Sequence, residues 1–305
     1  MAITAVEHAE FAPRNPLSGC VIDDRYIVTM AYNSSTAGGT TPTDYAVFDA
    51  VTETSNMYSF PLRNIDGQSM VPYNGYAWAI GREYAGTNFV IARINPVSGG
   101  YTLFTVASGA RGNTAWIYYQ NGWFLCSVLN TYDAPQDARS HFRVNATTMI
   151  ASGLTGAGIY NKSTSTMAGY GDTVWTAQTG SGFGGIRRRG VAMSTGVVTD
   201  LDGTSSFPGG GPRVGTPLYT GGIFTAPSQA WDMSTETMIR TLPDPLGAMD
   251  VGPDGLLYSV NTTTVQAVDG ITGASRTETF PVTRLERSLV FRANGKLWTP
   301  SGYPL

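Results

Sequence analysis

The sequence is poor in charge and in lysine, and both shortages restrict what the chain can bind. Charged residues make up 13% of its 305 residues, against roughly 25% in typical soluble domains. The formal net charge is −3 at pH 7, so no whole-molecule positive field exists to gather nucleic acid or anionic lipid. Only Lys162 and Lys296 are lysines, so cationic recognition depends on arginine. We expect no nucleic-acid partner.

Histidine and cysteine are equally scarce. The two histidines, His8 and His141, are too few for a multi-histidine metal site. Cys20 and Cys126 are the only cysteines, which excludes a multi-disulfide framework but leaves a single disulfide open. The glycine-rich stretches GSGFGG and PGGGP lack the following Lys-Ser/Thr of a phosphate-binding loop. We expect neither a metal nor a cofactor.

Long hydrophobic runs are also missing. No window of about 18 residues is both apolar and uncharged, so we expect no membrane-spanning segment and no membrane insertion. The N-terminal residues MAITAVEHAEFAPR contain neither a basic leader nor an apolar stretch. They predict that the chain carries no secretory signal.

Turn signals are what the sequence has in abundance, with 37 glycines. One motif recurs seven times: a tight-turn dipeptide followed by β-branched and aromatic residues. Asn-Gly, Asp-Gly and Gly-Gly supply the positive φ values that two-residue hairpin turns need. The copies are DDRYIVTMAY from Asp23, NGYAWAIG from Asn74, NGWFLCSV from Asn121, GDTVWTAQ from Gly171, GGIFTAP from Gly221, DGLLYSV from Asp254 and NGKLWTP from Asn294.

A second hairpin motif falls between these copies. An extended segment ends in Asp, Asn or Ser, and Thr, Ser or Gly follows two or three residues later. The Asp or Asn side chain can accept hydrogen bonds from backbone N–H groups further along the turn. Its six copies are VFDAVTET from Val47, RINPVSGG from Arg93, RVNATTM from Arg143, VAMSTGV from Val191, AWDMSTET from Ala230 and AVDGITGA from Ala267.

Together the two motifs predict an all-β chain of four-stranded antiparallel units that recur about every 35 to 50 residues. Six units and a final strand pair, RSLVFRANGKLWTP, leave the N-terminal AITAVEHAEF to complete a seventh. The chain resembles the seven-bladed β-propeller families, particularly those with an Asp-x-x-Thr-Gly hairpin, which Asp269, Thr272 and Gly273 match best. The resemblance implies one domain over residues 1–305, with N- and C-terminal strands closing the ring in one blade. A six-bladed ring and a β-sandwich are the alternatives.

One aromatic residue in each repeated strand is expected to be buried between blades. These residues are Tyr26, Trp78, Trp123, Trp175, Phe224, Tyr258 and Trp298.

The connections predict where a site lies. If strands A to D run from the inside of each blade outward, the two recurring turns are the A–B and C–D turns and share one face. The B–C loops on the other face are long in the first four blades and short in the next two. Long irregular loops on a rigid scaffold usually carry function. The residues expected to bind a ligand there are Arg82, Glu83, Tyr84, Tyr132, Asp133, Asp137, Arg139, His141, Phe183, Arg187 and Arg188.

The candidate residues contain no motif that names a reaction. His141 is near Asp137 in sequence, but no G-x-S-x-G nucleophile motif accompanies it. Asp133 and Asp137 could serve as the paired acids of a glycosidase, whose separation the sequence does not supply. Arg187 and Arg188, with Arg189, form the one local basic cluster, and it suits an acidic sugar or a carboxylate better than a nucleic-acid backbone.

Three classes of function follow: a non-enzymatic interaction module, a carbohydrate-active enzyme (glycoside hydrolase or polysaccharide lyase), and an intracellular repeat scaffold. We favour the first and expect no catalytic residues. Low charge, richness in Thr, Gly and Ala, and arginine in place of lysine make the chain similar in style to phage tail-associated virion proteins. That resemblance implies a virion location and, as partners, a surface glycan or other virion proteins.

Overall fold

In the computed structural model, the described part of the chain is mainly β-structure. The described residues are 16–31, 43–60, 62–63, 70–83, 86–107, 115–130, 138–156, 164–179, 186–200, 223–226, 229–232, 237–241, 249–251, 256–261, 264–269, 272–279 and 291–298. Every regular element within these ranges is a β-strand. The same ranges contain no helix long and apolar enough to cross a membrane. The prediction of an all-β chain is confirmed.

The strands form seven sheets within the described ranges. The first sheet contains β1 (Pro16–Ile22), β2 (Tyr26–Ala31), β3 (Thr43–Asp49) and β4 (Thr54–Phe60). The second contains β5 (Leu62–Arg63), β6 (Met70–Tyr73), β7 (Tyr76–Glu83), β8 (Phe89–Ile94) and β9 (Tyr101–Ala107). The third contains β10 (Ala115–Gln120), β11 (Trp123–Asn130), β12 (Ala138–Asn145) and β13 (Ala151–Gly153).

The remaining strands form four more sheets. The fourth contains β14 (Thr155–Gly156), β15 (Thr164–Tyr170), β16 (Thr173–Thr179), β17 (Ile186–Ala192) and β18 (Val197–Asp200). The fifth contains β19 (Ile223–Ala226), β20 (Gln229–Asp232) and β21 (Thr237–Thr241). The sixth contains β22 (Met249–Val251), β23 (Leu257–Asn261), β24 (Thr264–Val268) and β25 (Ser275–Thr279), and the seventh contains β26 (Phe291–Ala293) and β27 (Lys296–Trp298).

Neighbouring strands pair antiparallel with two departures from a simple meander. The innermost strand of the second sheet is split, because β5 and β6 pair with different parts of β7. The short strand β14 pairs in parallel with β18 and adds a fifth strand to the outer edge of the fourth sheet. The first, third and sixth sheets are four-stranded meanders in chain order.

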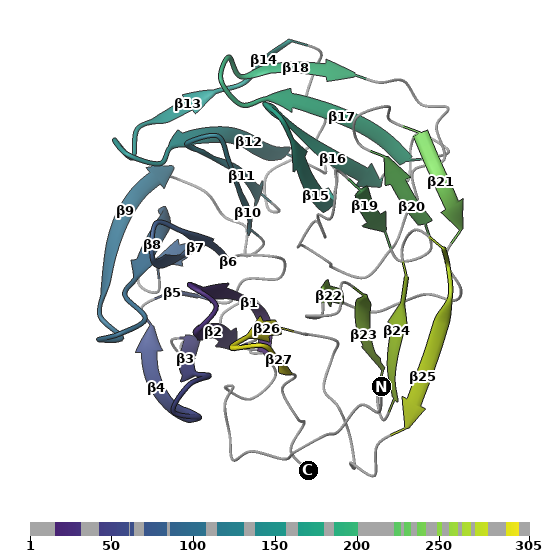
Figure 1. Ribbon diagram of the computed structural model, residues 1–305. Helices are drawn as coiled ribbons and strands as arrows, with labels where there is room; N and C mark the ends of the chain where they lie inside the picture. The colour runs from purple at the N-terminus through teal and green to yellow at the C-terminus, as the bar shows by residue number, and fades with distance from the viewer. Residues whose placement is uncertain are drawn as a thin grey trace.

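The sheets follow one another in chain order around the middle of the molecule, and the pair β26–β27 lies beside β1 and β2 (Figure 1). Strand β26 contacts β1 and β2 of the first sheet and β22 of the sixth. The last described strands therefore lie between the first sheet and the sixth.

The A–B turns adopt the backbone that their sequences predict. Positive φ values occur at both central residues of the turns Asn74–Gly75, Asn121–Gly122 and Asn294–Gly295, and at Asp23 and Asp24 in the first sheet. This geometry matches the right-handed twist of the flanking strands.

The C–D turns are built on the predicted side-chain acceptors. Asp49 Oδ1 accepts from the Val51 N–H at 2.9 Å, Asn95 Oδ1 from the Val97 N–H at 2.9 Å, and Asn145 Oδ1 from the Thr147 N–H at 3.0 Å. Asp269 Oδ1 accepts from the Thr272 N–H at 3.1 Å. Both hairpins form in the described copies, but the C–D turn of the fourth sheet has Ala192 where the other turns have the predicted Asp or Asn acceptor.

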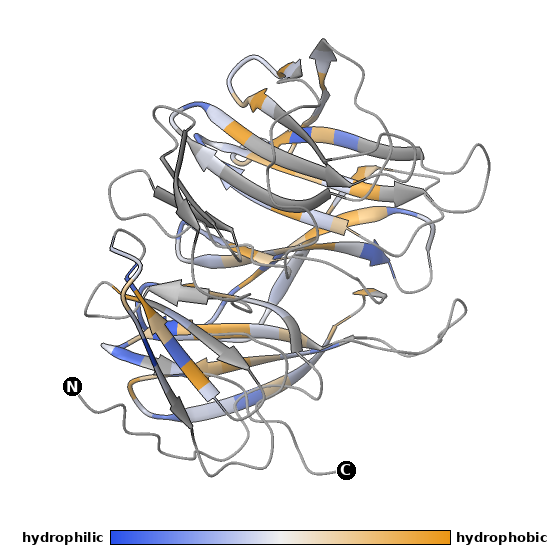
Figure 2. Cartoon of the chain, turned by 90° about the vertical axis from the view of Figure 1, so that its right-hand side faces the viewer, coloured by the Kyte–Doolittle hydropathy of each residue, from blue (hydrophilic) through white to orange (hydrophobic). Residues whose placement is uncertain are grey.

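Hydrophobic stretches run along the described strands and are interrupted by hydrophilic residues (Figure 2). One cluster of buried side chains extends through the first three sheets, from Cys20 to Ala146. A second joins the third and fourth sheets around Val174 and Met193. Both cysteines are buried and free, so the disulfide that the sequence left open is not formed.

Burial between sheets holds for some of the predicted aromatic residues and not for others. Trp78, Tyr258 and Trp298 are at most 6% exposed. Tyr26 and Trp123 are only half-buried, under Arg25 and Arg143. The difference follows position along the strand. Tyr26 and Trp123 are first in their B strands, next to the turn, whereas Trp78 and Trp298 are third. The burial of Trp175 and Phe224 lies outside the described side chains.

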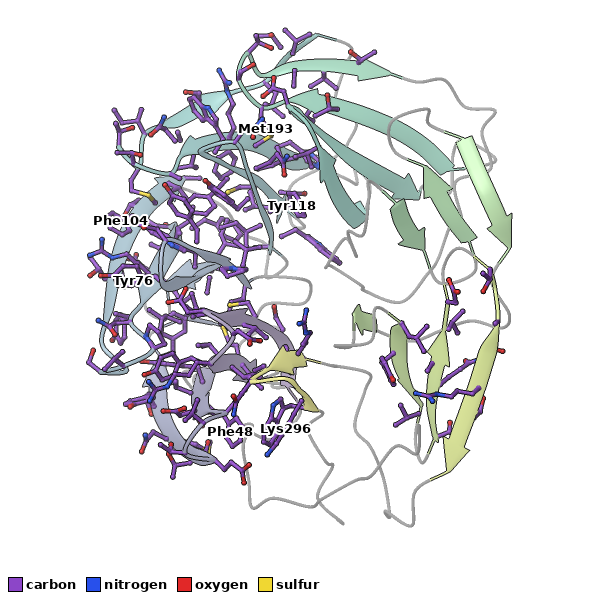
Figure 3. All side chains as sticks on the ribbon, in the orientation of Figure 1. Phe48, Tyr76, Phe104, Tyr118, Met193 and Lys296 are labelled. Atoms are coloured by element: carbon purple, nitrogen blue, oxygen red, sulfur yellow. The ribbon has the colours of Figure 1, made fainter. Side chains whose placement is uncertain are left out.

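The pair β26–β27 is fastened to the first sheet by both polar and apolar contacts. The Asn294 N–H donates to the Asp24 carbonyl at 2.6 Å, and Asn294 Nδ2 donates to the Ala50 carbonyl at 3.0 Å. Lys296 Nζ lies 2.6 Å from Glu53 Oε1. The ring of Phe48 in β3 packs edge-on against Trp298, in the region where Figure 3 labels Phe48 and Lys296. Segments more than 240 residues apart in sequence are thereby joined.

Candidate functional site

The A–B and C–D turns of a sheet lie at the same end of its strands. The Ala50 N–H in a C–D turn donates to the Arg25 carbonyl in the A–B turn of the same sheet at 2.8 Å. The Ala146 N–H and the Gly122 carbonyl repeat this contact at 2.9 Å in the third sheet. The B–C connections must therefore start from the opposite end of the strands, as the sequence predicts.

Hairpin turns also take part in contacts between neighbouring sheets. Asn121 Nδ2 donates to the Gly171 carbonyl of the fourth sheet at 2.8 Å, and Tyr45 Oη of the first sheet donates to the Gly99 carbonyl of the second. Burial raises the pKa of Tyr45 to about 12, so this donor stays protonated. The A–B turns of the third and fourth sheets therefore lie side by side.

The B–C connections differ in length between the two halves of the chain. In the first four sheets they are residues 32–42, 84–88, 131–137 and 180–185, whereas in the fifth and sixth they are residues 227–228 and 262–263. The predicted asymmetry is confirmed. The strands reach further into these segments than expected, so several candidate residues lie on strands.

Arg82 and Glu83 are the last two residues of β7, and both form hydrogen bonds with the B–C connection that follows. Arg82 Nε donates to the Gly86 carbonyl at 3.1 Å. Glu83 Oε2 accepts from Asn88 Nδ2 at 3.1 Å, and the Glu83 N–H donates to the Asn88 carbonyl at 2.9 Å. Both residues are half-buried. Asn88, which the sequence analysis did not single out, fixes the return of this connection.

Arg139 and His141 belong to β12, where they pair with Leu129 and Ser127 of β11. His141 Nε2 lies 3.0 Å from Ser127 Oγ. Because Ser127 is fully buried, its hydroxyl is a hydrogen-bonding partner for the imidazole and is not presented to a substrate. Sequence reasoning missed Ser127 because the contact depends on strand register.

Arg187 and Arg188 lie on β17, opposite Gln178 and Ala177 of β16. Tyr84, Tyr132, Asp133, Asp137 and Phe183 lie outside the described residues. The structure thus brings Glu83 together with Asn88, and His141 with Ser127. The other described candidates lie near the B–C ends of their strands.

The described residues contain no group of three or more His, Cys, Asp or Glu side chains that could hold a metal ion. Burial raises the pKa values of the Cys20 and Cys126 thiols, which keeps both thiols protonated and unreactive. No described cluster therefore has the composition of a metal centre or of an activated thiol.

The opposite face carries the described ionic groups with shifted pKa values. The Arg25 guanidinium forms a paired hydrogen bond with Asp49, with Nε to Oδ1 at 3.0 Å and Nη2 to Oδ2 at 2.6 Å. This contact lowers the pKa of Asp49 to about 2. The hydrogen bond from the Ser194 hydroxyl lowers the pKa of Asp172. Both carboxylates close turns.

No protein-family model matches this chain, and a search of curated proteins finds no match to it.

Proposed function

We propose that this protein is a non-enzymatic binding module that engages a surface glycan through the B–C connections of its first four sheets. The observation that supports the proposal is the length asymmetry: four consecutive connections are long, and the connections of the fifth and sixth sheets are two residues each. Regular sheets do not need such extensions, and long connections on a rigid scaffold are the usual carriers of binding groups.

The scaffold that we propose is a seven-bladed β-propeller over residues 1–305. Two features support it: the described residues form seven sheets in chain order, and β26 contacts both the first and the sixth. In this proposal, N-terminal residues join β26 and β27 in the seventh blade. Closure would remove the unpaired edges of an open array.

The candidate residues suit a glycan. Tyr84, Tyr132 and Phe183 can stack on sugar rings, and the arginines can form paired hydrogen bonds with hydroxyl or carboxylate oxygens. Low charge and the style of the sequence support a virion location, with a tail-associated protein as the specific form of the proposal.

The test is a double substitution with a matched control. Tyr132→Ala with Arg187→Ala should abolish binding on a glycan array and leave the melting temperature unchanged. The control pair, Tyr101→Ala with Arg292→Ala, also removes one tyrosine and one arginine. Tyr101 and Arg292 are both exposed and lie next to the hairpin turns on the other face. The control variant should therefore bind as the wild type does.

Two results would contradict the proposal. If the control pair abolishes binding and the Tyr132 and Arg187 pair does not, the wrong face has been assigned. If polysaccharide is degraded, and Asp133→Asn or Asp137→Asn stops the degradation, the chain is a carbohydrate-active enzyme. Binding to other virion proteins in place of glycans would keep the face and replace the ligand.

A further inference from the structure

The outer edges of the sheets differ in how they are protected from pairing with other chains. An outer strand exposes a row of backbone N–H and C=O groups, and proteins block such edges with charge, bulges, short length or a covering strand. Among the described outer strands, β18 is covered by β14, β13 has three residues, and β9 and β21 belong to ladders with register shifts. Strand β25 contains Arg276 and Glu278.

Within the described residues, strand β4 carries none of these protections. Its seven residues, TSNMYSF, include no charged residue and no proline. Its ladder with β3 runs without a register shift from Asp49↔Thr54 to Thr43↔Phe60. Met57, at the middle of the strand, is 50% exposed.

The strand is also held firmly from within the molecule. The Tyr58 ring stacks on Tyr45 at 5.1 Å between centroids, and Phe60 packs edge-on against Tyr101 of the second sheet at 5.3 Å. A partner strand would therefore meet an edge that is already ordered.

The backbone groups that face outward follow from the C–D turn. In the second sheet, the Asn95 N–H donates to the Gly100 carbonyl at 2.8 Å, and the Gly99 N–H donates to the Asn95 carbonyl at 2.9 Å. The first sheet repeats this turn, since the Glu53 N–H donates to the Asp49 carbonyl at 2.7 Å and Asp49 pairs with Thr54. Hydrogen-bonded pairs alternate along an antiparallel ladder. The backbone N–H and C=O groups of residues 54, 56, 58 and 60 consequently bond to β3. Those of Ser55, Met57 and Ser59 face outward.

These three outward residues are symmetric about Met57. If a second β4 lies antiparallel with a two-fold axis at Met57, Met57 pairs with its own copy and Ser55 pairs with Ser59 in both directions. All three positions then form hydrogen-bonded pairs, with the two Met57 Cα atoms about 5.5 Å apart. The uncharged strands oppose no like charges, and the two exposed methionine side chains meet on one face of the joined sheet.

We propose that the outer edge of β4 is a self-association surface, on which two copies of this chain pair β4 with β4 about a two-fold axis at Met57. The pairing extends the first sheet into an eight-stranded sheet across two molecules. Because one strand edge buries little surface, the dimer is weak and forms at high protein concentration.

The test compares two lysine substitutions on the same strand. Met57→Lys places two ammonium groups opposite each other across the axis and should weaken dimerisation in sedimentation equilibrium at least about tenfold. Asn56→Lys is the control, because residue 56 faces Tyr58 of the other copy and not its own counterpart. It should dimerise more strongly than Met57→Lys. An equimolar mixture of Met57→Lys and Met57→Glu should form heterodimers, since unlike charges then meet at the axis.

Amide hydrogen exchange gives a readout that needs no substitution. The amides of Ser55, Met57 and Ser59 should become protected as protein concentration rises, whereas those of Asn56 and Tyr58 should be protected throughout. A monomer at every concentration, a Met57→Lys protein that associates like the wild type, or concentration-dependent protection on a different strand would each overturn the proposal.

Discussion

At the residue scale, tryptophans at different strand positions should differ in what they contribute to stability. Trp78 is 4% exposed and donates its indole N–H to the Tyr73 carbonyl at 2.9 Å, across the A–B turn. Trp298 repeats this contact with Ala293 at 2.9 Å. Trp123 is half-buried, with the Arg143 guanidinium 4.1 Å from its ring centroid.

We therefore predict that Trp78→Ala lowers the free energy of unfolding by about 3–5 kcal/mol, the usual cost of removing a buried tryptophan. Trp123→Ala should cost less, at most about 2 kcal/mol, because less apolar area is buried. Urea unfolding of the two variants measures both costs. Equal losses would mean that position along the strand does not decide how much a tryptophan contributes to stability.

Asp49 gives a second residue-scale prediction, about pH. Its pKa is lowered to about 2, chiefly by the hydrogen bond from Arg25, against an ordinary value of about 3.9. A lowered pKa in the folded state stabilises the protein above the ordinary value, and this stabilisation is lost as pH falls from about 4 to about 2.

Asp49→Asn isolates the ion pair, because Asn95 and Asn145 already close the equivalent turns with amide oxygens. The stability difference between wild type and variant should shrink as pH falls through this window. Thermal melts at pH 5, 3 and 2 would follow it. Arg25→Gln should reproduce the behaviour, and a difference that stays constant with pH would exclude the ion pair as its source.

At the element scale, strands of neighbouring sheets approach closely where glycine replaces a side chain. A Cβ added at Gly19 of β1 would lie 2.7 Å from Phe291 Cζ of β26 and 2.8 Å from the Val28 carbonyl oxygen. Gly153 in β13 has no heavy atom within 4 Å of the same position.

Gly19→Ala should therefore destabilise the protein by about 1–3 kcal/mol, as overpacking does. Gly153→Ala should change stability by no more than about 0.5 kcal/mol. Chemical denaturation of both variants checks the pair. If Gly19→Ala leaves the stability unchanged, β26 does not pack closely against β1 at this position.

The turns show how far sequence reasoning reaches at the element scale. Hairpin chemistry is local, so Asn74–Gly75 and Asn121–Gly122 could be predicted from the residues alone. The fourth sheet departs from the pattern, because Ala192 stands where the other C–D turns have Asp or Asn. Its turn still forms: the Gly196 N–H donates to the Ala192 carbonyl at 2.7 Å, and Asp172 Oδ1 accepts from the Ser194 N–H at 3.0 Å. An acceptor borrowed from the adjacent turn depends on tertiary structure, and no local motif signals it.

At the scale of the whole molecule, the order of the sheets and the asymmetry of their connections could be predicted, because both follow from repeated turns. The split inner strand of the second sheet, the parallel β14 and the Ser127–His141 contact could not. Each depends on pairing between segments whose register the sequence does not state. The same limit explains why Arg139 and Arg187 were expected on loops and lie on strands.

The proposed ring closure can be tested by deletion. Residues 291–298 join the first sheet through Asn294, Lys296 and the cluster of Phe48, Phe291 and Trp298. Deleting residues 291–305 should lower the melting temperature, since the buried side chains of Phe48 and Ile27 would become exposed. If residues 1–13 complete the same blade, deleting them should also lower it.

The double deletion distinguishes one shared blade from two independent ends. Effects at separate sites add, whereas effects within one cooperative unit do not. Because each half of a shared blade is stable only against the other, the double deletion should lower the melting temperature by little more than the larger single deletion. Additive losses in calorimetry would place the two ends in different packing units. An N-terminal deletion that melts like the intact chain would refute closure through the N-terminus.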